Sequence, residues 1–257
     1  MLCLLLLALL ASCGPAEQSP PASRVLFVGN SLTYVGNVPA VYSALASENG
    51  LTSPSDMIVR GGATLTQRVD DGSVARALEA GGYSHLVIQE RGGDLMCAFG
   101  AEACAESLDA VRALAELGRR RGVPVLLLGT YQPDPSASQR LVEAESAAAG
   151  AAGIAYVEVS ETLRLLREAD PKRAWFAEDG FHPGSDLALL NAILVYRAIH
   201  DSLPEPGPLR VAAPIYGSTS GLDETLRSSA SPPPLAATPM EIQYTSDTVA
   251  RLIGASR

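Results

Sequence analysis

Three residues of this sequence have the chemical types and the placing that nucleophilic catalysis needs. Ser31 follows the apolar run 25–28 and a Gly-Asn pair, and His182 stands three positions after Asp179. A serine hydroxyl is a weak nucleophile until a base takes its proton, and histidine, with an ordinary pKa of about 6.5, suits that task. A carboxylate that holds the other imidazole nitrogen fixes the tautomer of the base. The three residues therefore predict a serine hydrolase with Ser31 as nucleophile, His182 as base and Asp179 as orienting acid.

Few residues compete for these roles, because the chain has only three histidines. His85 opens an expected strand and is expected to be structural. His200 lies at the end of an amphipathic helix, where a solvated or capping histidine is favoured. Glu178 is an alternative to Asp179, although the spacing favours Asp179. An acid three residues before a histidine is often structural, so the pair gains its meaning from Ser31.

The elements that must position these residues are strands and helices that alternate along the chain. Apolar runs predict strands at 25–28, 57–59, 85–89, 123–128 and 155–159, and helical patterns predict helices from a cap at Asn37 to Gly50, over 103–121 and over 184–198. Five strands alternating with helices predict an α/β fold, whose parallel sheet is covered on both faces by right-handed crossovers. Ligands of such sheets bind at the carboxyl ends of the strands. Gly29 is expected to let the backbone turn sharply there and expose Ser31.

Residues 1–13 predict an export signal rather than a part of the fold. The apolar run 2–10 is too short to span a bilayer, and the segment Leu-Ala-Ser-Cys13 looks like a bacterial lipobox, in which Cys13 becomes the lipidated first residue. An n-region without positive charge leaves an ordinary secretory signal as the alternative, and both signals predict export. Residues 14–23 then read as a flexible tether. Gly14 implies the outer membrane of a two-membrane bacterium, with membrane contact only through the lipid anchor.

Charge and cysteine content limit the partners and cofactors. The net charge of −9 argues against nucleic acid, which selects basic surfaces. The one basic run, Arg119–Arg121, ends an expected helix, where cations suit the helix dipole. In an oxidising compartment Cys97 and Cys104 are candidates for a disulfide, with two free thiols as the alternative. No CxxC pair and no HExxH motif occurs, so no metal site is expected.

The last part of the chain has a different composition. Residues 204–208 and 228–234 are proline-rich and are expected to be irregular, and a final helix is expected around 246–253. We therefore predict a catalytic domain over 24–203 and an extension over 204–257. No internal repeat and no second domain is expected.

Two blocks of the sequence resemble those of the SGNH/GDSL hydrolases. Gly29–Thr33 (GNSLT) is similar to the GDSL block, and Asp179–Pro183 (DGFHP) is similar to the DxxH block. The similarity is greatest to a bacterial branch whose first block reads GNSxT and whose third block reads QEQS, and it runs over about 24–203. It implies a flavodoxin-like three-layer α/β/α sandwich with a five-stranded parallel sheet. It also implies hydrolysis of acyl esters without a metal or an organic cofactor, by the same three residues.

The resemblance further implies an oxyanion hole. The backbone N–H of Ser31 is one donor, and the glycine of the second block corresponds to Gly62, whose backbone can approach closely because it has no Cβ. An ordinary strand-to-helix turn is the alternative for that glycine. The asparagine usual in the third block is absent, and Gln89 stands at the corresponding strand end, as a candidate donor or as a residue that bonds to the backbone. Glu90 and Asp94 are expected to be loop acids rather than catalytic ones.

The leading interpretation is an exported esterase for small acyl groups, with O-acetyl groups on carbohydrate as its substrates. Trp175 and Phe176 either line an acceptor site or form a structural aromatic pair. One alternative is a lipase or thioesterase for longer chains, which would share the site residues. Another is a surface lipoprotein that keeps the fold and binds a glycan without turnover. The glycines of a GxGxxG motif are absent, so dinucleotide binding is not expected.

Overall fold

The apolar runs of the sequence form the centre of one six-stranded sheet. The structure is a computed structural model and describes residues 23–256, so the expected signal, Cys13 and the tether up to residue 22 lie outside the described residues. The strand order is β5-β4-β3-β1-β2-β7, and all neighbours are parallel except β7, which runs antiparallel to β2. The strands are β1 (Arg24–Gly29), β2 (Ser55–Arg60), β3 (Tyr83–Ile88), β4 (Val125–Leu128), β5 (Ala155–Val157) and β7 (Asp223–Ser228).

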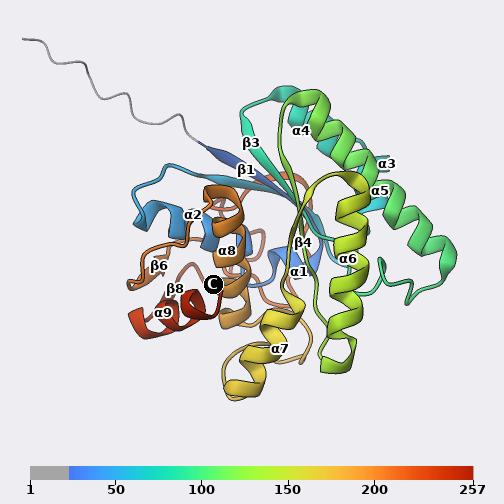
Figure 1. The fold of residues 1–257 in the computed structure, drawn as a ribbon. Helices are drawn as coiled ribbons and strands as arrows, with labels where there is room; N and C mark the ends of the chain where they lie inside the picture. Colours follow the sequence, from blue (N-terminus) through green and yellow to red (C-terminus); the bar gives the residue numbers. More distant parts are fainter. Residues whose placement is uncertain (1–22, 257) are drawn as a thin grey trace, which may run out of the picture.

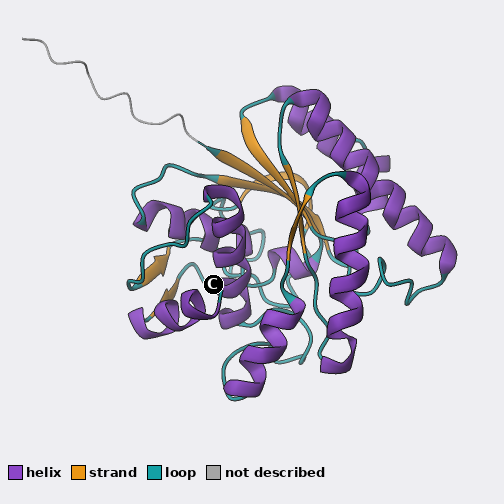
Figure 2. Cartoon of the chain, viewed as in Figure 1, coloured by secondary structure: helices purple, strands orange, loops and turns teal. Residues whose placement is uncertain are grey.

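Helices cover both faces of this sheet, as the alternation of strands and helices requires (Figure 1 and Figure 2). Side chains alternate along a strand, so Val25 and Phe27 of β1 enter one apolar core and Leu26 and Val28 enter the other. The first core contains residues of α1 (Ser31–Tyr34), α2 (Val38–Glu48), α7 (Ser160–Ala169), α8 (Ser185–His200) and α9 (Ser246–Ala255). The second contains residues of α3 (Leu65–Asp70), α4 (Ser73–Ala80), α5 (Ala101–Arg121) and α6 (Ser138–Ala152). The three-layer α/β/α prediction is confirmed.

Local signals place the helix ends. The Asn37 side chain caps α2 by accepting from the Ala40 N–H at 3.2 Å, with Pro39 in the first turn. Helix α5 begins two residues before the expected start and ends at Gly122, which has a left-handed φ of 67°. Arg119–Arg121 form its last turn, as expected from the helix dipole.

The C-terminal part of the chain contributes to the sheet, which the sequence analysis did not anticipate. Strand β7 pairs with β2 from Asp56↔Ser228 to Arg60↔Asp223, so the predicted count of five strands is one too low. The segment Asp223–Ser228 has no apolar run because it is an edge strand whose residues are all partly or fully exposed. A second small sheet joins β6 (Leu209–Val211) and β8 (Ile242–Tyr244), and the 3₁₀ turn η1 (Pro135–Ala137) precedes α6.

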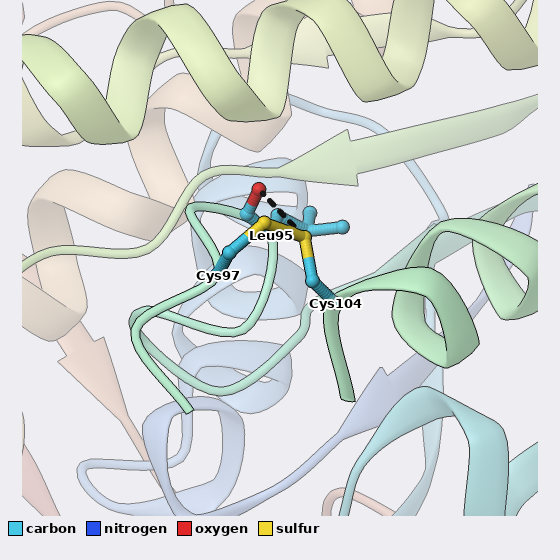
Figure 3. Close-up of a disulfide and its surroundings, with 3 residues drawn as sticks. All are labelled: Leu95, Cys97 and Cys104. Carbon is cyan, nitrogen blue, oxygen red and sulfur yellow. Dashed lines mark hydrogen bonds between the residues drawn. A yellow bond between two sulfur atoms is a disulfide. The ribbon is translucent and has the colours of Figure 1, made fainter. Parts of the chain in front are cut away.

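A disulfide joins Cys97 and Cys104, the expected pair, with their Cα atoms 4.7 Å apart (Figure 3). It ties the loop after β3 to the first turns of α5, and the sulfur of Cys104 lies 3.8 Å from the carbonyl oxygen of Leu95. Within residues 23–256, no helix combines the length and apolarity of a membrane-spanning segment. The same residues contain no group of three or more histidine, cysteine or acidic side chains arranged to hold a metal ion.

Candidate active site

Ser31 is the first residue of the short helix α1, directly after β1. Asn30 caps this helix by accepting from the Leu32 N–H at 3.0 Å. Ser31 is half-buried, and neither its Oγ nor its N–H bonds to another described residue. The backbone at Gly29 lies outside the left-handed region, so the expected glycine-dependent sharp turn is not what requires this residue. A Cβ on Gly29 would instead overlap the hydroxyl oxygen of Thr33, so close packing of α1 against the strand end requires glycine.

His182 and Asp179 form the predicted pair at the carboxyl edge of the sheet. The Nδ1 of His182 donates to Oδ2 of Asp179 at 2.6 Å, which leaves Nε2 as the nitrogen that can accept a proton. Oδ1 of Asp179 accepts the backbone N–H groups of Phe181 and His182, each at 3.0 Å. Burial favours the neutral carboxyl, but the hydrogen bonds from His182 and from the two backbone N–H groups lower the pKa of Asp179 below its ordinary value. Asp179 is therefore ionised at neutral pH, and Glu178 is exposed beside it.

The loop that carries this pair is fixed at its base. The Ala177 N–H donates to the His182 carbonyl at 2.8 Å, and Gly184 N–H donates to the Trp175 carbonyl at 2.9 Å. Trp175 is buried and donates through Nε1 to the Asp170 carbonyl. Of the two roles considered for it, lining an acceptor site or packing as a structural aromatic, it has the structural one. The ring of Phe176 packs against Tyr131, with 5.8 Å between ring centroids.

The other two histidines lie apart from this pair. His200 is half-buried and its Nε2 is 3.1 Å from the Tyr42 hydroxyl, while His85 lies beside Ser84. Burial lowers the pKa of both histidines. His85 is structural, as expected, whereas His200 packs against Tyr42 and is not the solvated or capping histidine that was expected.

Helix α1 contacts the second and third blocks through its side chains. The Thr33 hydroxyl donates to Oε1 of Gln89 at 2.8 Å, which joins α1 to the end of β3. The Tyr34 hydroxyl lies 3.1 Å from the position a Cβ on Gly61 would occupy, which places α1 beside the second block. These two contacts bring the Ser31 helix together with both segments expected to supply oxyanion donors.

The segment after α1 contacts the loop that carries His182. A Cβ on Gly36 would lie 3.9 Å from the carbonyl oxygen of Pro183 and 4.0 Å from that of Gly184. Ser31 and His182 therefore stand on adjoining segments of the same sheet edge, although the described residues form no hydrogen bond between Ser31 Oγ and His182.

Gly62, the expected second donor, has a left-handed backbone conformation. Its φ of +68° lies in the left-handed region, while no heavy atom lies within 4 Å of the position of a Cβ. Glycine is thus required here by the backbone angle and not by the close approach we expected. The N–H groups of both neighbours are occupied, Gly61 with the Leu222 carbonyl and Ala63 with the Arg60 carbonyl, each at 3.1 Å. The N–H of Gly62 bonds to no described residue, so it is free to meet a ligand.

Gln89 has a side chain that is almost fully enclosed. Its Oε1 accepts from Thr33, and its Nε2 donates to the Gly129 carbonyl at 3.1 Å, so it bridges the ends of β1, β3 and β4. This is the second of the two roles considered for it, a strand-end residue that bonds to the backbone. The amide nitrogen Nε2 carries two hydrogens, and the bond to Gly129 uses one of them. The second hydrogen remains for an oxyanion, so the role of Gln89 as a donor stays a prediction.

The sequence analysis missed the supporting roles of several acids, among them Glu90, which it expected to be a loop acid and which is buried. Glu90 accepts from the backbone at the start of α3, and Glu145 of α6 accepts from the Thr130 N–H at the end of β4. Asp186 of α8 accepts from Arg173 and from the Ala174 N–H, each at 3.1 Å, and so holds the start of the loop that carries His182. The signal for these residues was an acid next to an expected strand or helix end, but the sequence does not say which backbone group each one meets.

Comparisons with known proteins bear on the fold. No family model matches the sequence, and no curated protein matches it. Among solved structures, a protein from Slackia heliotrinireducens assigned to the SGNH hydrolases is 24% identical, with a TM-score of 0.58 over 68% of this chain and 98% of its own. A GDSL-like lipase from Parabacteroides merdae is 14% identical, with a TM-score of 0.55 over 73% of this chain and 99% of its own. An acetyl xylan esterase, AlAXEase, is 14% identical, with a TM-score of 0.54 over 68% of this chain and 98% of its own.

These structures share the three-layer sandwich, and each is covered almost completely by this chain. At such identities the likeness concerns the fold. Together with the strand order and the helices on both faces, it shows that this chain has the fold of the SGNH hydrolases.

Proposed function

We propose that the protein is a serine esterase that hydrolyses small acyl esters, O-acetyl groups on carbohydrate in particular. The observation that carries the proposal is the hydrogen bond of 2.6 Å between His182 Nδ1 and Asp179, on a loop that adjoins the segment of Ser31. This bond fixes the imidazole tautomer with a free Nε2, as a base for a serine requires. The backbone N–H groups of Ser31 and Gly62, which follow β1 and β2, bond to none of residues 23–256.

The proposed reaction has two steps. Nε2 of His182 takes the proton of Ser31 Oγ as the oxygen attacks the ester carbonyl carbon, and the carbonyl oxygen becomes an oxyanion. His182 then gives this proton to the departing alcohol, leaving an acyl group on Ser31. A water molecule, deprotonated by His182, repeats the sequence and releases the carboxylic acid and the free serine.

The backbone groups contribute in both steps. The N–H groups of Ser31 and Gly62 are proposed to donate to the oxyanion, where one donor is typically worth about 2.7–4 kcal/mol. Asp179 stabilises the imidazolium that forms when His182 holds the proton. None of these groups requires a metal or an organic cofactor.

Preference for short acyl groups on carbohydrate is proposed by analogy. One structure with this fold is an acetyl xylan esterase, and a shared fold raises the expectation without fixing a substrate. Nitrophenyl acetate, butyrate and octanoate distinguish an acetylesterase from a lipase or thioesterase, and acetylated oligosaccharides test the sugar. A kcat/KM that rises with chain length would overturn the short-acyl proposal.

Covalent labelling tests the serine directly. A fluorophosphonate probe should label the wild-type protein at Ser31, and Ser31→Ala should abolish both labelling and hydrolysis while the fold is retained. A correctly folded protein that neither reacts with the probe nor hydrolyses any of these esters would favour the glycan-binding alternative.

We also propose that the protein is exported and held on a membrane by lipid on Cys13, a residue outside the described structure. The support is the lipobox-like sequence and its apolar neighbours. Cys13→Ala should release the protein from the membrane fraction of a bacterial host. Continued membrane association of that variant would contradict lipidation at this cysteine.

A further inference from the structure

The carboxyl group of Glu90 is buried between the third block and the second. It follows β3, only 1% of the residue is exposed, and Oε1 and Oε2 each lie 3.2 Å from the backbone nitrogen of Leu65. Oε1 also accepts the N–H of Arg91 at 2.9 Å. Leu65 is the first residue of α3, so this one side chain ties the end of β3 to the segment that follows Gly62.

The turn that contains Gly62 is short and is held at both ends. Before it, Gly61 N–H is bound to the Leu222 carbonyl. After it, Thr64 caps α3 in a capping box with Gln67, and Glu90 takes the N–H of Leu65. Only two residues separate Gly62 from Leu65, so the direction of the Gly62 N–H depends on where the first residue of α3 is held.

The groups around Glu90 leave its charge to be stabilised mainly by backbone N–H groups. Burial raises its pKa to about 7, and the nearby charge of Asp94 raises it as well. The N–H groups of Arg91 and Leu65 and the Ser107 hydroxyl of α5 act in the opposite direction. The Arg91 guanidinium is bonded to Asp94, at 2.6 and 3.1 Å, rather than to Glu90.

We propose that the ionised carboxylate of Glu90 is a positioning group for the oxyanion hole: by holding the Leu65 N–H it aims the N–H of Gly62 at the developing oxyanion. This inference rests on the esterase function proposed above. Glu90 does not touch the substrate, and its effect passes through the α3 end of the turn. A neutral carboxyl carries a hydrogen on one oxygen and loses part of its accepting capacity, so protonation of Glu90 loosens that end.

The consequence is a second proton that must be absent for full activity. The base His182 must be unprotonated, and under this proposal Glu90 must be unprotonated too. Each such group adds about one unit to the slope of log kcat/KM against pH on the acid side. A neutral Glu90 misaligns the donor without removing it, so the wild-type slope should approach about two only over the roughly one or two pH units below about 7 in which Glu90 gains its proton. Over the same interval Glu90→Gln should give a slope of about one.

The size of the effect follows from the oxyanion hole. Removing a donor costs about 10²–10³-fold in kcat, and a donor that is only misaligned should cost less, about 10- to 100-fold. Glu90→Gln should therefore lower kcat at pH 8.5 by that factor with little change in KM, because the lost interaction is made only in the transition state. A residue that merely supports folding would not change the slope.

Glu145 provides a matched control. It is 2% exposed and accepts from the Thr130 N–H at 3.0 and 3.2 Å, and burial raises its pKa to about 7 as well. It holds the turn after β4 instead of the turn of Gly62. Glu145→Gln removes the same charge from an equally buried place, and it should keep the wild-type slope of about two on the acid side.

A second pair of variants tests the donor instead of the acceptor. Leu65→Pro deletes the N–H that Glu90 accepts, and proline is tolerated at the first position of a helix. Thr64 before it has φ −86° and ψ 160°, which suits a residue preceding proline. Leu65→Ala also loses the buried side chain but keeps the N–H. Leu65→Pro should give a slope of about one and Leu65→Ala a slope of about two.

The outcomes separate the two proposals. A wild type that hydrolyses esters with an acid slope of about one, or a Glu90→Gln enzyme with the wild-type profile and kcat, overturns the role of Glu90 alone. A wild type without esterase activity overturns the proposed function, and the role of Glu90 falls with it. If Glu90→Gln does not fold, the wild-type slope and the Leu65 pair decide the question.

Discussion

Replacing Asp179 by asparagine should abolish most of the activity through the tautomer of His182. The structure decides which way the new amide faces. Three donors surround the carboxylate: the N–H groups of Phe181 and His182, both at 3.0 Å from Oδ1, and Nδ1 of His182 at 2.6 Å from Oδ2. Asparagine keeps one oxygen, and the two backbone donors hold it on their side. The NH₂ group then faces Nδ1, which must become an acceptor, so Nε2 carries the hydrogen and cannot take a proton from Ser31.

The expected size is a fall of about 10⁴-fold in kcat, or about 5 kcal/mol, as found when the equivalent change is made in a serine protease triad. The assay is nitrophenyl acetate hydrolysis at pH 8, with thermal melting as a check on folding. Glu178→Gln is the matched control, since it removes the adjacent, exposed acid, and its kcat should stay within about twofold of wild type. An Asp179→Asn enzyme with near wild-type kcat, or a large fall in the kcat of Glu178→Gln, would refute the assignment of Asp179 as the orienting acid.

Three further predictions concern stability. Gln89→Ala should lower the free energy of unfolding by about 2–4 kcal/mol in urea titrations, because the Thr33 hydroxyl and the Gly129 carbonyl lose buried partners. A loss below about 1 kcal/mol would contradict the bridge between the strand ends. An added fall of about 10²–10³-fold in kcat would identify Gln89 as an oxyanion donor. Replacing Cys97 and Cys104 by serine should cost roughly 2.5 kcal/mol by the loop-entropy model, and a melting temperature that does not change on reduction would count against a bridge in solution. Burial raises the pKa of Glu145 to about 7, so its contribution to stability is complete below about pH 4.5 and is lost as the pH rises through 7. Glu145→Gln should flatten that decline in melting temperature, and an unchanged decline would exclude Glu145 as its source.

The backbone of the site was predictable from the sequence because it follows from local patterns and from sheet topology. The apolar run 25–28 and the cap at Asn37 placed β1 and α2. Parallel strands end on one edge, so the place of Ser31, directly after β1, at that edge could be predicted from the sequence. The bond between His182 and Asp179 spans three residues and depends on little else, which is why its spacing could be read directly.

The contacts that support the site were not predictable, because each joins segments far apart in the chain. Gln89 meets Thr33 and the Gly129 carbonyl only once three strands lie side by side. The two glycines show the same limit: both were recognised, but packing decides that Gly29 is needed for close approach, and the backbone angle decides that Gly62 is needed. Strand β7 was missed because an exposed edge strand carries almost no apolar pattern.

Stability and the proposed activity require opposite protonation states of the Glu90 carboxyl group. Burial of Glu90 makes its charge costly, so its contribution to stability is present below about pH 4.5 and declines as the pH rises through about 7. The proposed oxyanion hole requires that same charge, because only the carboxylate accepts fully from Leu65 and Arg91. Over one pH interval the activity should therefore rise while the folded state loses stability. The cost of burying this charge is thus tied, under the proposal, to the geometry that the carboxylate imposes on Gly62.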